Sequence, residues 1–245
     1  MTNRVIIILI FFTVFISSAQ IRNGRIEYGV NIEMLEGLKE NGPLKNTYAE
    51  TVENAKYLSF VLNFDKEKAV FSFDEGLAVA NSDLFMAKIS AGYMNVVYQN
   101  KEYSLCAVNG FGNYLLKTDA ISEWILENDT KEIQGFLCYK ATSTKKINNG
   151  KGSFVFPIIA WYCPKIPVSF GPNGYGNLPG LILELQVRNV VYGVKKIDLN
   201  LAKPPIMDNP KEYPVINQQE FDEMVMTAFK NRNAVNGFKK PDDKF

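Results

Sequence analysis

The sequence contains no histidine. This absence excludes Ser-His-Asp and Cys-His catalytic mechanisms, and it removes the commonest general base and the commonest transition-metal ligand. The 3 cysteines, Cys106, Cys138 and Cys163, are widely spaced, so a tetrahedral zinc site would lack at least one ligand. We therefore expect no metal and no cofactor.

Loops that bind calcium or phosphate are also missing. Asp74-Glu75-Gly76 and Asp242-Asp243 do not reproduce the spaced acidic signature of a calcium loop. The glycines between Gly171 and Gly176 precede a predicted strand, not the helix whose N-terminus would hold a phosphate. Carboxylate chemistry stays open, with Glu184 as the candidate. Its place among alternating leucines instead favours an outward-facing strand residue.

Charge of either sign is neither abundant nor clustered. The chain has 27 Lys and Arg against 26 Asp and Glu, and Arg4 is the only charged residue among the first 19, so residues 20–245 carry 26 of each. A nucleic-acid binder would show a basic patch or stripe. We expect no nucleic-acid partner.

The amino terminus has the pattern of a secretory leader. Arg4 precedes the apolar run 5–16, and Ser17-Ser18-Ala19 supplies small residues for cleavage after Ala19. A membrane anchor is the alternative, but this run is shorter than the ~20 apolar residues that span a bilayer. We therefore expect residues 1–19 to be removed. Residues 20–245 would form a single domain that does not span a membrane and is located in the periplasm or cell envelope, or secreted.

Short segments of alternating apolar and polar residues dominate the chain and predict strands. They lie at 25–34, 57–64, 69–73, 94–99, 103–108, 114–117, 123–127, 133–144, 153–162, 181–189 and 191–199. Helices are expected at 47–56 and 218–231, whereas residues 74–92 favour neither a helix nor a loop. The pattern predicts a mainly β fold, an antiparallel curved sheet or open half-barrel with one or two packed helices.

The predicted helix 218–231 has a recognisable start. Asn217 is a suitable N-cap, and Glu220 stands three residues later, as in a capping box. An apolar stripe that begins at Phe221 and Met224 follows. We expect this stripe to pack on the protein's own sheet, although it would also suit a membrane or a partner.

Two cysteines flank the predicted hairpin of segments 133–144 and 153–162. If this hairpin closes near Gly150, Cys138 and Cys163 fall nearly opposite one another and could form a disulfide. In the alternative, all three cysteines are buried, inert thiols.

The run 160–182 is the most distinctive stretch of the chain, with 4 prolines, 4 glycines and no acidic residue. Pro179-Gly180 predicts a type II turn, in which the second central residue takes a positive φ. We interpret the run as an architectural loop. If it binds a ligand, Trp161, Tyr162, Phe170 and Tyr175 are the expected anchors.

These residues carry a resemblance to a known family. Its motif residues here are Trp161, Tyr162, Pro167, Gly171, Pro172, Asn177, Leu178, Pro179, Gly180, Leu181 and Ile182. Together with Cys138-Tyr139-Lys140-Ala141 and the opening Gly24-Arg25-Ile26-Glu27-Tyr28, they resemble the GLPGLI family of exported Bacteroidetes proteins. Asn177 replaces the family's first glycine, and Asn tolerates the left-handed backbone region well.

The resemblance implies an exported envelope protein, often associated with outer-membrane, TonB-dependent transport systems. The strand pattern is also similar to the open half-barrel of periplasmic lipoprotein carriers, which is an analogy of fold. We expect a monomeric, non-enzymatic binding or accessory module for a lipid, an acylated peptide or an outer-membrane protein. Two alternatives are a scaffold that docks a transporter by strand addition and a histidine-free carboxylate hydrolase.

Overall fold

The computed structural model describes residues 21–34, 45–77, 84–110, 112–148 and 152–237. The predicted leader lies outside these ranges, as does the hairpin tip at Gly150. The strands are β1 (Gly24–Ile32), β2 (Ser59–Phe64), β3 (Ala69–Phe73), β4 (Val97–Gln99), β5 (Tyr103–Asn109), β6 (Asn113–Asp119), β7 (Ile125–Ile133), β8 (Phe136–Asn148), β9 (Ser153–Cys163), β10 (Leu181–Val187), β11 (Val190–Leu199) and β12 (Val215–Ile216).

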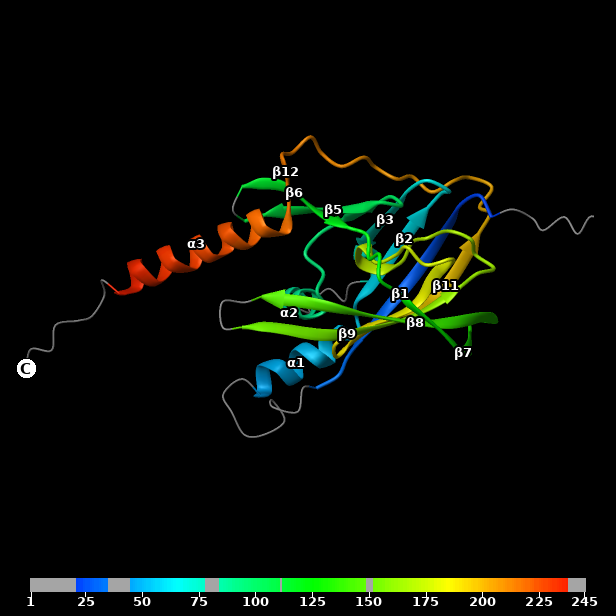
Figure 1. Cartoon of the computed structure of the whole chain (residues 1–245), viewed down its shortest axis with the longest axis horizontal. Helices are drawn as coiled ribbons and strands as arrows, with labels where there is room; N and C mark the ends of the chain where they lie inside the picture. Colours follow the sequence, from blue (N-terminus) through cyan, green and yellow to red (C-terminus); the bar gives the residue numbers. More distant parts are fainter. Residues whose placement is uncertain (1–20, 35–44, 78–83, 111, 149–151, 238–245) are drawn as a thin grey trace, which may run out of the picture.

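All described strands belong to one sheet, in the order β12-β6-β5-β4-β3-β2-β1-β11-β10-β9-β8-β7. Every pairing is antiparallel except the short parallel pair of β12 and β6. The edge strands β7 and β12 do not pair with each other, so the sheet is open. Figure 1 shows two arms, β4 to β6 with β12 and β7 to β9, on either side of β1, β2 and β11. The predicted open antiparallel sheet is confirmed.

The core lies on the concave face of the central strands. Ile26, Tyr28, Val30 and Ile32 alternate along β1 and are all buried, as the sequence pattern predicts. Neighbouring strands add aromatic rings. The Phe60 ring, for example, stacks on Phe71 with centroids 5.2 Å apart. Each such side chain contributes about 1.5–3 kcal/mol through burial, so this face supplies most of the fold's stability.

The predicted hairpins differ from the observed ones mainly at their turns. β8 pairs with β9 in a register centred on Gly150, as expected. The expectation of one strand beginning at Ile133 is wrong, because Gln134 and Gly135 form a tight turn between β7 and β8. Both turn residues have positive φ, which gives the type I′ geometry that matches strand twist.

Within the described ranges, three α-helices accompany the sheet: α1 (Lys45–Ala55), α2 (Phe85–Ser90) and α3 (Gln218–Gly237), with short 3-10 turns η2 (Glu75–Leu77) and η3 (Pro172–Gly174). The capping box at α3 is confirmed, since Asn217 and Glu220 exchange backbone-to-side-chain hydrogen bonds of 2.7 and 3.0 Å. Phe221 and Met224 pack on the sheet, and the rest of α3 projects away from it (Figure 1). Among the described helices, none combines the length and apolarity needed to cross a membrane.

Residues 164–180, which we call the motif loop, connect β9 to β10 across the concave face. Ile166, Phe170 and Leu178 are at most 2% exposed, so the loop is itself part of the core. Backbone hydrogen bonds from Leu181 to Ile166 (2.9 Å) and from Ile182 to Phe170 (3.0 Å) hold its two halves together. The interpretation of this run as an architectural element agrees with this packing.

The turn at Pro179 is tighter than predicted. The Gly180 amide donates to the Leu178 carbonyl at 2.8 Å, which closes a three-residue γ-turn and not a four-residue type II turn. The positive φ expected at Gly180 is present, at 157°. A Cβ at this position would overlap the carbonyl of Cys163. Asn177 adopts the left-handed region with φ of 65°.

We expect Gly180→Ala to lower the free energy of unfolding by about 3 kcal/mol or more, because the added methyl group displaces the backbone of Cys163. Gly193→Ala is the matched control, since nothing lies within 4 Å of its Cβ position, and its effect should stay within about 1 kcal/mol. Urea unfolding followed by circular dichroism measures both. Similar midpoints for the two variants would contradict this account of the loop.

Candidate functional site

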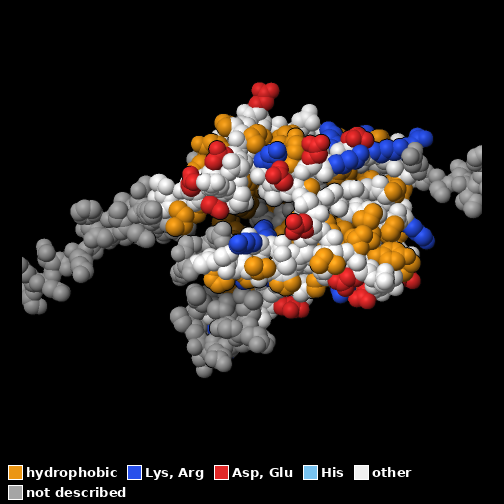
Figure 2. Space-filling model, viewed as in Figure 1, with side chains coloured by type: hydrophobic (Ala, Val, Ile, Leu, Met, Phe, Trp, Pro, Cys, Tyr) orange, Lys and Arg blue, Asp and Glu red, His pale blue; other side chains and the backbone are white. Residues whose placement is uncertain are grey.

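A cavity of about 410 Å³ lies between the two arms of the sheet. Its walls come from β4, β5 and β6 on one side and from β8, β9, β10 and β11 on the other, with η3 and the segment after α2 between them. Figure 2 shows a hollow between the arms, close to the start of α3. The volume falls within the ~300–1,000 Å³ range of small-molecule sites.

The motif loop reaches this cavity because three side chains tie it to distant elements. Gln99 on β4 donates to the carbonyls of Gly174 and Tyr175 at 3.1 and 3.0 Å. Trp124 donates to Gly176 at 3.0 Å, and Asn177 donates to the carbonyl of Ile121 at 2.8 Å. The tip of the loop is thereby placed between the arms, and its residues 173–175 line the cavity.

One part of the lining is apolar. It is formed by Met94, Val97, Leu116, Ile158 and Val187. Val97, Leu116 and Ile158 are buried, whereas Met94 is 53% exposed at the opening. These side chains cannot hydrogen-bond a polar ligand, so they favour an aliphatic or aromatic group.

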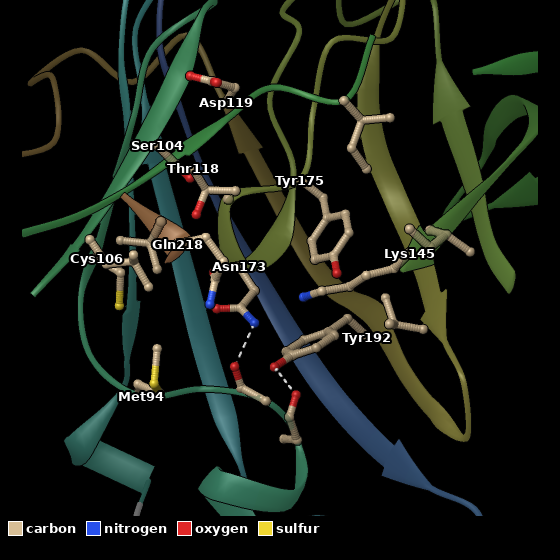
Figure 3. A pocket seen from close by; sticks show the side chains of 18 of the residues that line it. Met94, Ser104, Cys106, Thr118, Asp119, Lys145, Asn173, Tyr175, Tyr192 and Gln218 are labelled. Atoms are coloured by element: carbon tan, nitrogen blue, oxygen red, sulfur yellow. Dashed lines mark hydrogen bonds between the residues drawn. The ribbon is translucent and has the colours of Figure 1, made fainter. Parts of the chain in front are cut away.

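A second part of the lining is polar, and Figure 3 shows Lys145, Asn173, Tyr175 and Tyr192 converging there. The Tyr192 hydroxyl donates to the Ala91 carbonyl at 2.8 Å, and Asn173 Nδ2 donates to the Gly92 carbonyl at 2.9 Å. Lys145 Nζ lies 6.0 Å from the centroid of the Tyr175 ring. Within the described part of the chain, no carboxylate forms an ion pair with Lys145, so its charge is available to a ligand.

Burial perturbs two titratable groups in the lining. Desolvation raises the pKa of the Tyr192 hydroxyl well above its usual value, which keeps that hydroxyl protonated at physiological pH. Desolvation also raises the pKa of the Cys106 thiol to about 11, against a smaller opposing effect of a backbone hydrogen bond with Asn95. Both groups are neutral at pH 7, so Lys145, Lys146 and Asp119 are the charged residues of the lining.

Glu184 is not part of this cavity. Lys131 Nζ lies 2.6 Å from Glu184 Oε1 and 4.7 Å from the centroid of the Trp161 ring. Leu183 and Leu185 on either side are fully buried on the opposite face. Glu184 is thus the outward-facing strand residue that the alternation predicts. Across the described ranges, no three His, Cys, Asp or Glu side chains are grouped to hold a metal ion.

Cys138 and Cys163 face each other, as the hairpin prediction requires. The pairing of Tyr139 with Tyr162 makes them the next opposed residues of β8 and β9. Both are fully buried and are free thiols in the structure. A disulfide between them stays a prediction.

The predicted motif residues do not line the cavity. None of the eleven, from Trp161 to Ile182, contributes to the lining. Of the four aromatic anchors, Phe170 is fully buried, Tyr162 is 6% exposed and Trp161 contacts Lys131, so only Tyr175 reaches the cavity.

The remaining lining residues could not be predicted locally, because they come from seven separate strands, from the start of α3 and from the connections between elements. The only local signal was Asn173-Gly174 after Pro172, a pair suited to the positive φ values of 53° and 83° that expose this tip.

Comparison with known proteins gives little beyond the fold. A family model described as "Protein of unknown function (Porph_ging)" matches residues 154–184, which comprise most of β9, the motif loop and the start of β10. No curated protein matches the chain. The chain is similar to two crystal structures of PNGF-II, in the P21 and C2 space groups. Their TM-scores are 0.49 and 0.50, the sequence identities are 16% and 15%, and each match covers 84% of this chain. The chain spans about a third of the length of PNGF-II (34% and 33%), and identity this low shows a shared fold alone.

Proposed function

We propose that the protein is a non-enzymatic binding module whose cavity takes an amphipathic ligand with an acyl chain and an anionic head. The observation that carries the proposal is the open cavity of about 410 Å³, whose lining combines an apolar wall with Lys145 and Lys146. Lipids and acylated peptides both present this chemistry. On the basis of the predicted leader at residues 1–19, we propose that this binding takes place in the cell envelope or outside the cell.

The apolar wall supports an acyl chain as the buried part of the ligand. The cavity is lined by Ile158 on β9, Val187 on β10, Val97 on β4 and Leu116 on β6. Transfer of a methylene group from water to such a wall contributes about 0.8 kcal/mol, so a few methylenes give measurable affinity. Met94, exposed at the opening, adds an adaptable apolar contact.

Lys145 supports an anionic head group. Its ammonium group points into the cavity between Asn173 and the two tyrosines (Figure 3). The Asn173 amide and the Tyr192 hydroxyl donate to backbone carbonyls, which holds both side chains beside Lys145, and the second N–H of the Asn173 amide can donate to an anionic oxygen. A carboxylate or phosphate would satisfy the positive charge of Lys145, whereas a cation would find Lys145 and Lys146 repulsive.

Strand addition to a transporter receives weaker support. β7 is a free edge, and its Ile125 and Leu126 are 68% and 55% exposed. However, the register shifts between Leu126 and Thr130, and Lys140 pairs with Glu127 and Asp129 along this edge. A bulged, charged edge disfavours pairing with another strand. Catalysis by Glu184 is also weakly supported, because Lys131 neutralises this carboxylate on the outer face.

We expect a fluorescent fatty-acid analogue to bind the purified protein and palmitate to displace it. Val187→Trp, which enlarges a side chain of the lining, should weaken binding at least about tenfold by filling the cavity. Val155→Trp is the control, since Val155 is 61% exposed and lies outside the lining. Absence of binding to the wild type, or equal binding by Val187→Trp, would reject the cavity as the site.

The role of Lys145 is separable from that of the apolar wall. Lys145→Ala should weaken binding of a fatty acid about threefold to tenfold, as loss of a partly exposed ion pair does, and should leave binding of the alcohol of equal chain length unchanged. Lys101→Ala removes an equal charge, from a lysine paired with Glu67 outside the cavity, and should change neither. Equal losses for acid and alcohol would show that Lys145 acts by packing and not by charge.

Cys106 reports on the cavity through its pH dependence. Because its pKa is raised to about 11, alkylation of Cys106 by iodoacetamide should rise about tenfold per pH unit from pH 7 to 10, whereas an ordinary thiol levels off near 9. Saturating fatty acid should slow the reaction at each pH by covering the lining. Mass spectrometry of the peptide with Cys106 measures the rate, and a plateau near pH 9 would contradict the burial of this thiol.

A further inference from the structure

Cys138 and Cys163 occupy positions suited to a covalent bond. They are directly opposed on the antiparallel strands β8 and β9, one step beyond the paired residues Tyr139 and Tyr162. Directly opposed residues of antiparallel strands have Cα atoms about 4.5–5.5 Å apart, within the ~4.4–6.8 Å range of disulfides. The two thiols are in direct contact and fully buried, so each is the other's nearest reaction partner.

The surroundings of the two thiols shift their pKa values in opposite directions. The hydrogen bond from Cys138 lowers the pKa of the Cys163 thiol below its usual value, assisted by the backbone amides of Lys165 and Ile166 and by the Lys165 charge. The same contact, together with burial, raises the pKa of Cys138. Lys131 and Glu184 are the other charged groups nearby, and they pair with each other. Cys163 is therefore the nucleophilic member and Cys138 the resolving member of the pair.

We propose that Cys138 and Cys163 form a disulfide that joins β8 to the end of β9, where the motif loop begins. During folding, before the pair is buried, the Cys163 thiolate attacks one sulfur of a low-molecular-weight disulfide and releases the other half of this oxidant as a thiol. Cys138 then gives up its proton, attacks Cys163 Sγ and releases the second half. The protein loses two hydrogens in total, and the oxidant is reduced to two thiols.

The position of the bond gives it a structural consequence. Cys163 is the last residue of β9, and its carbonyl accepts the Ile166 amide at 3.1 Å and packs against Gly180. A bond at Cys163 therefore fixes the point from which both ends of the motif loop leave the sheet. Since this loop carries Asn173 and Tyr175 into the cavity, the disulfide would stabilise the cavity as well as the hairpin.

Cys106 is excluded from this pair by its place in the fold. It lies on β5 in the other arm of the sheet, where it lines the cavity. Burial raises its pKa to about 11, so it reacts slowly with a disulfide at neutral pH. The chain thus contains one pair of cysteines that can react with each other, and Cys106 serves as an internal control.

The test is oxidative refolding of the full chain. Reduced, denatured protein is diluted into buffer with oxidised and reduced glutathione, free thiols are trapped with iodoacetamide, and peptides are mapped by mass spectrometry. We expect one cross-link between Cys138 and Cys163, a mass loss of two hydrogens and an alkylated Cys106. Reduction should lower the Tm by about 5–10 °C, in line with loss of a structural disulfide in a domain of this size.

Two variants test which cysteines form the cross-link. Cys106→Ser should refold and oxidise as the wild type does, while Cys138→Ser should lose both the cross-link and the Tm difference between oxidised and reduced samples. Cross-links that involve Cys106, alkylation of all three thiols at every glutathione ratio, or equal Tm values for the oxidised and reduced wild type would each overturn the proposal.

Discussion

The close contact between the backbones of Gly180 and Cys163 is the constraint on which the rest of the structure depends. No side chain fits between them, so the two ends of the motif loop leave β9 and β10 from almost the same point. The residues between must then fold back over the concave face, where Ile166 and Phe170 become core residues. Without this contact the loop would extend into solvent, and Gln99 and Trp124 would lose the carbonyls to which they donate.

The cavity and the hydrophobic core have a residue in common. Tyr192 lines the cavity and also packs edge-on against Phe60 and Phe71, at centroid distances of 5.7 and 5.9 Å. Tyr93 joins the same cluster, 4.8 Å from Phe60. A ligand that contacts Tyr192 therefore contacts the cluster that stabilises the sheet. Because such a ligand binds the folded state alone, it raises the apparent stability of the protein by mass action.

Local patterns in the sequence predicted the local structure well. The alternation from Ile26 to Ile32 predicted β1, and Asn217 with Glu220 predicted the start of α3, because each pattern depends on neighbours in the chain. The turn at Gln134-Gly135 was missed, since glutamine is not a typical residue for a positive φ. The cavity could not be predicted, because its lining joins residues as distant as Val97 and Tyr192 through the order of strands in the sheet.

The residues that set the backbone geometry of the motif loop are largely different from the residues that line the cavity and could recognise a ligand. The glycines and prolines of the motif loop set close approaches and turn angles, and among them Gly174 alone lines the cavity. The loop contributes only its tip to the lining, and most of the other lining residues belong to strands before and after it. Those strand residues can change size and charge without disturbing the contact at Gly180. A chain with the same loop could therefore keep the open sheet and bind a different ligand, so the fold alone does not specify the ligand.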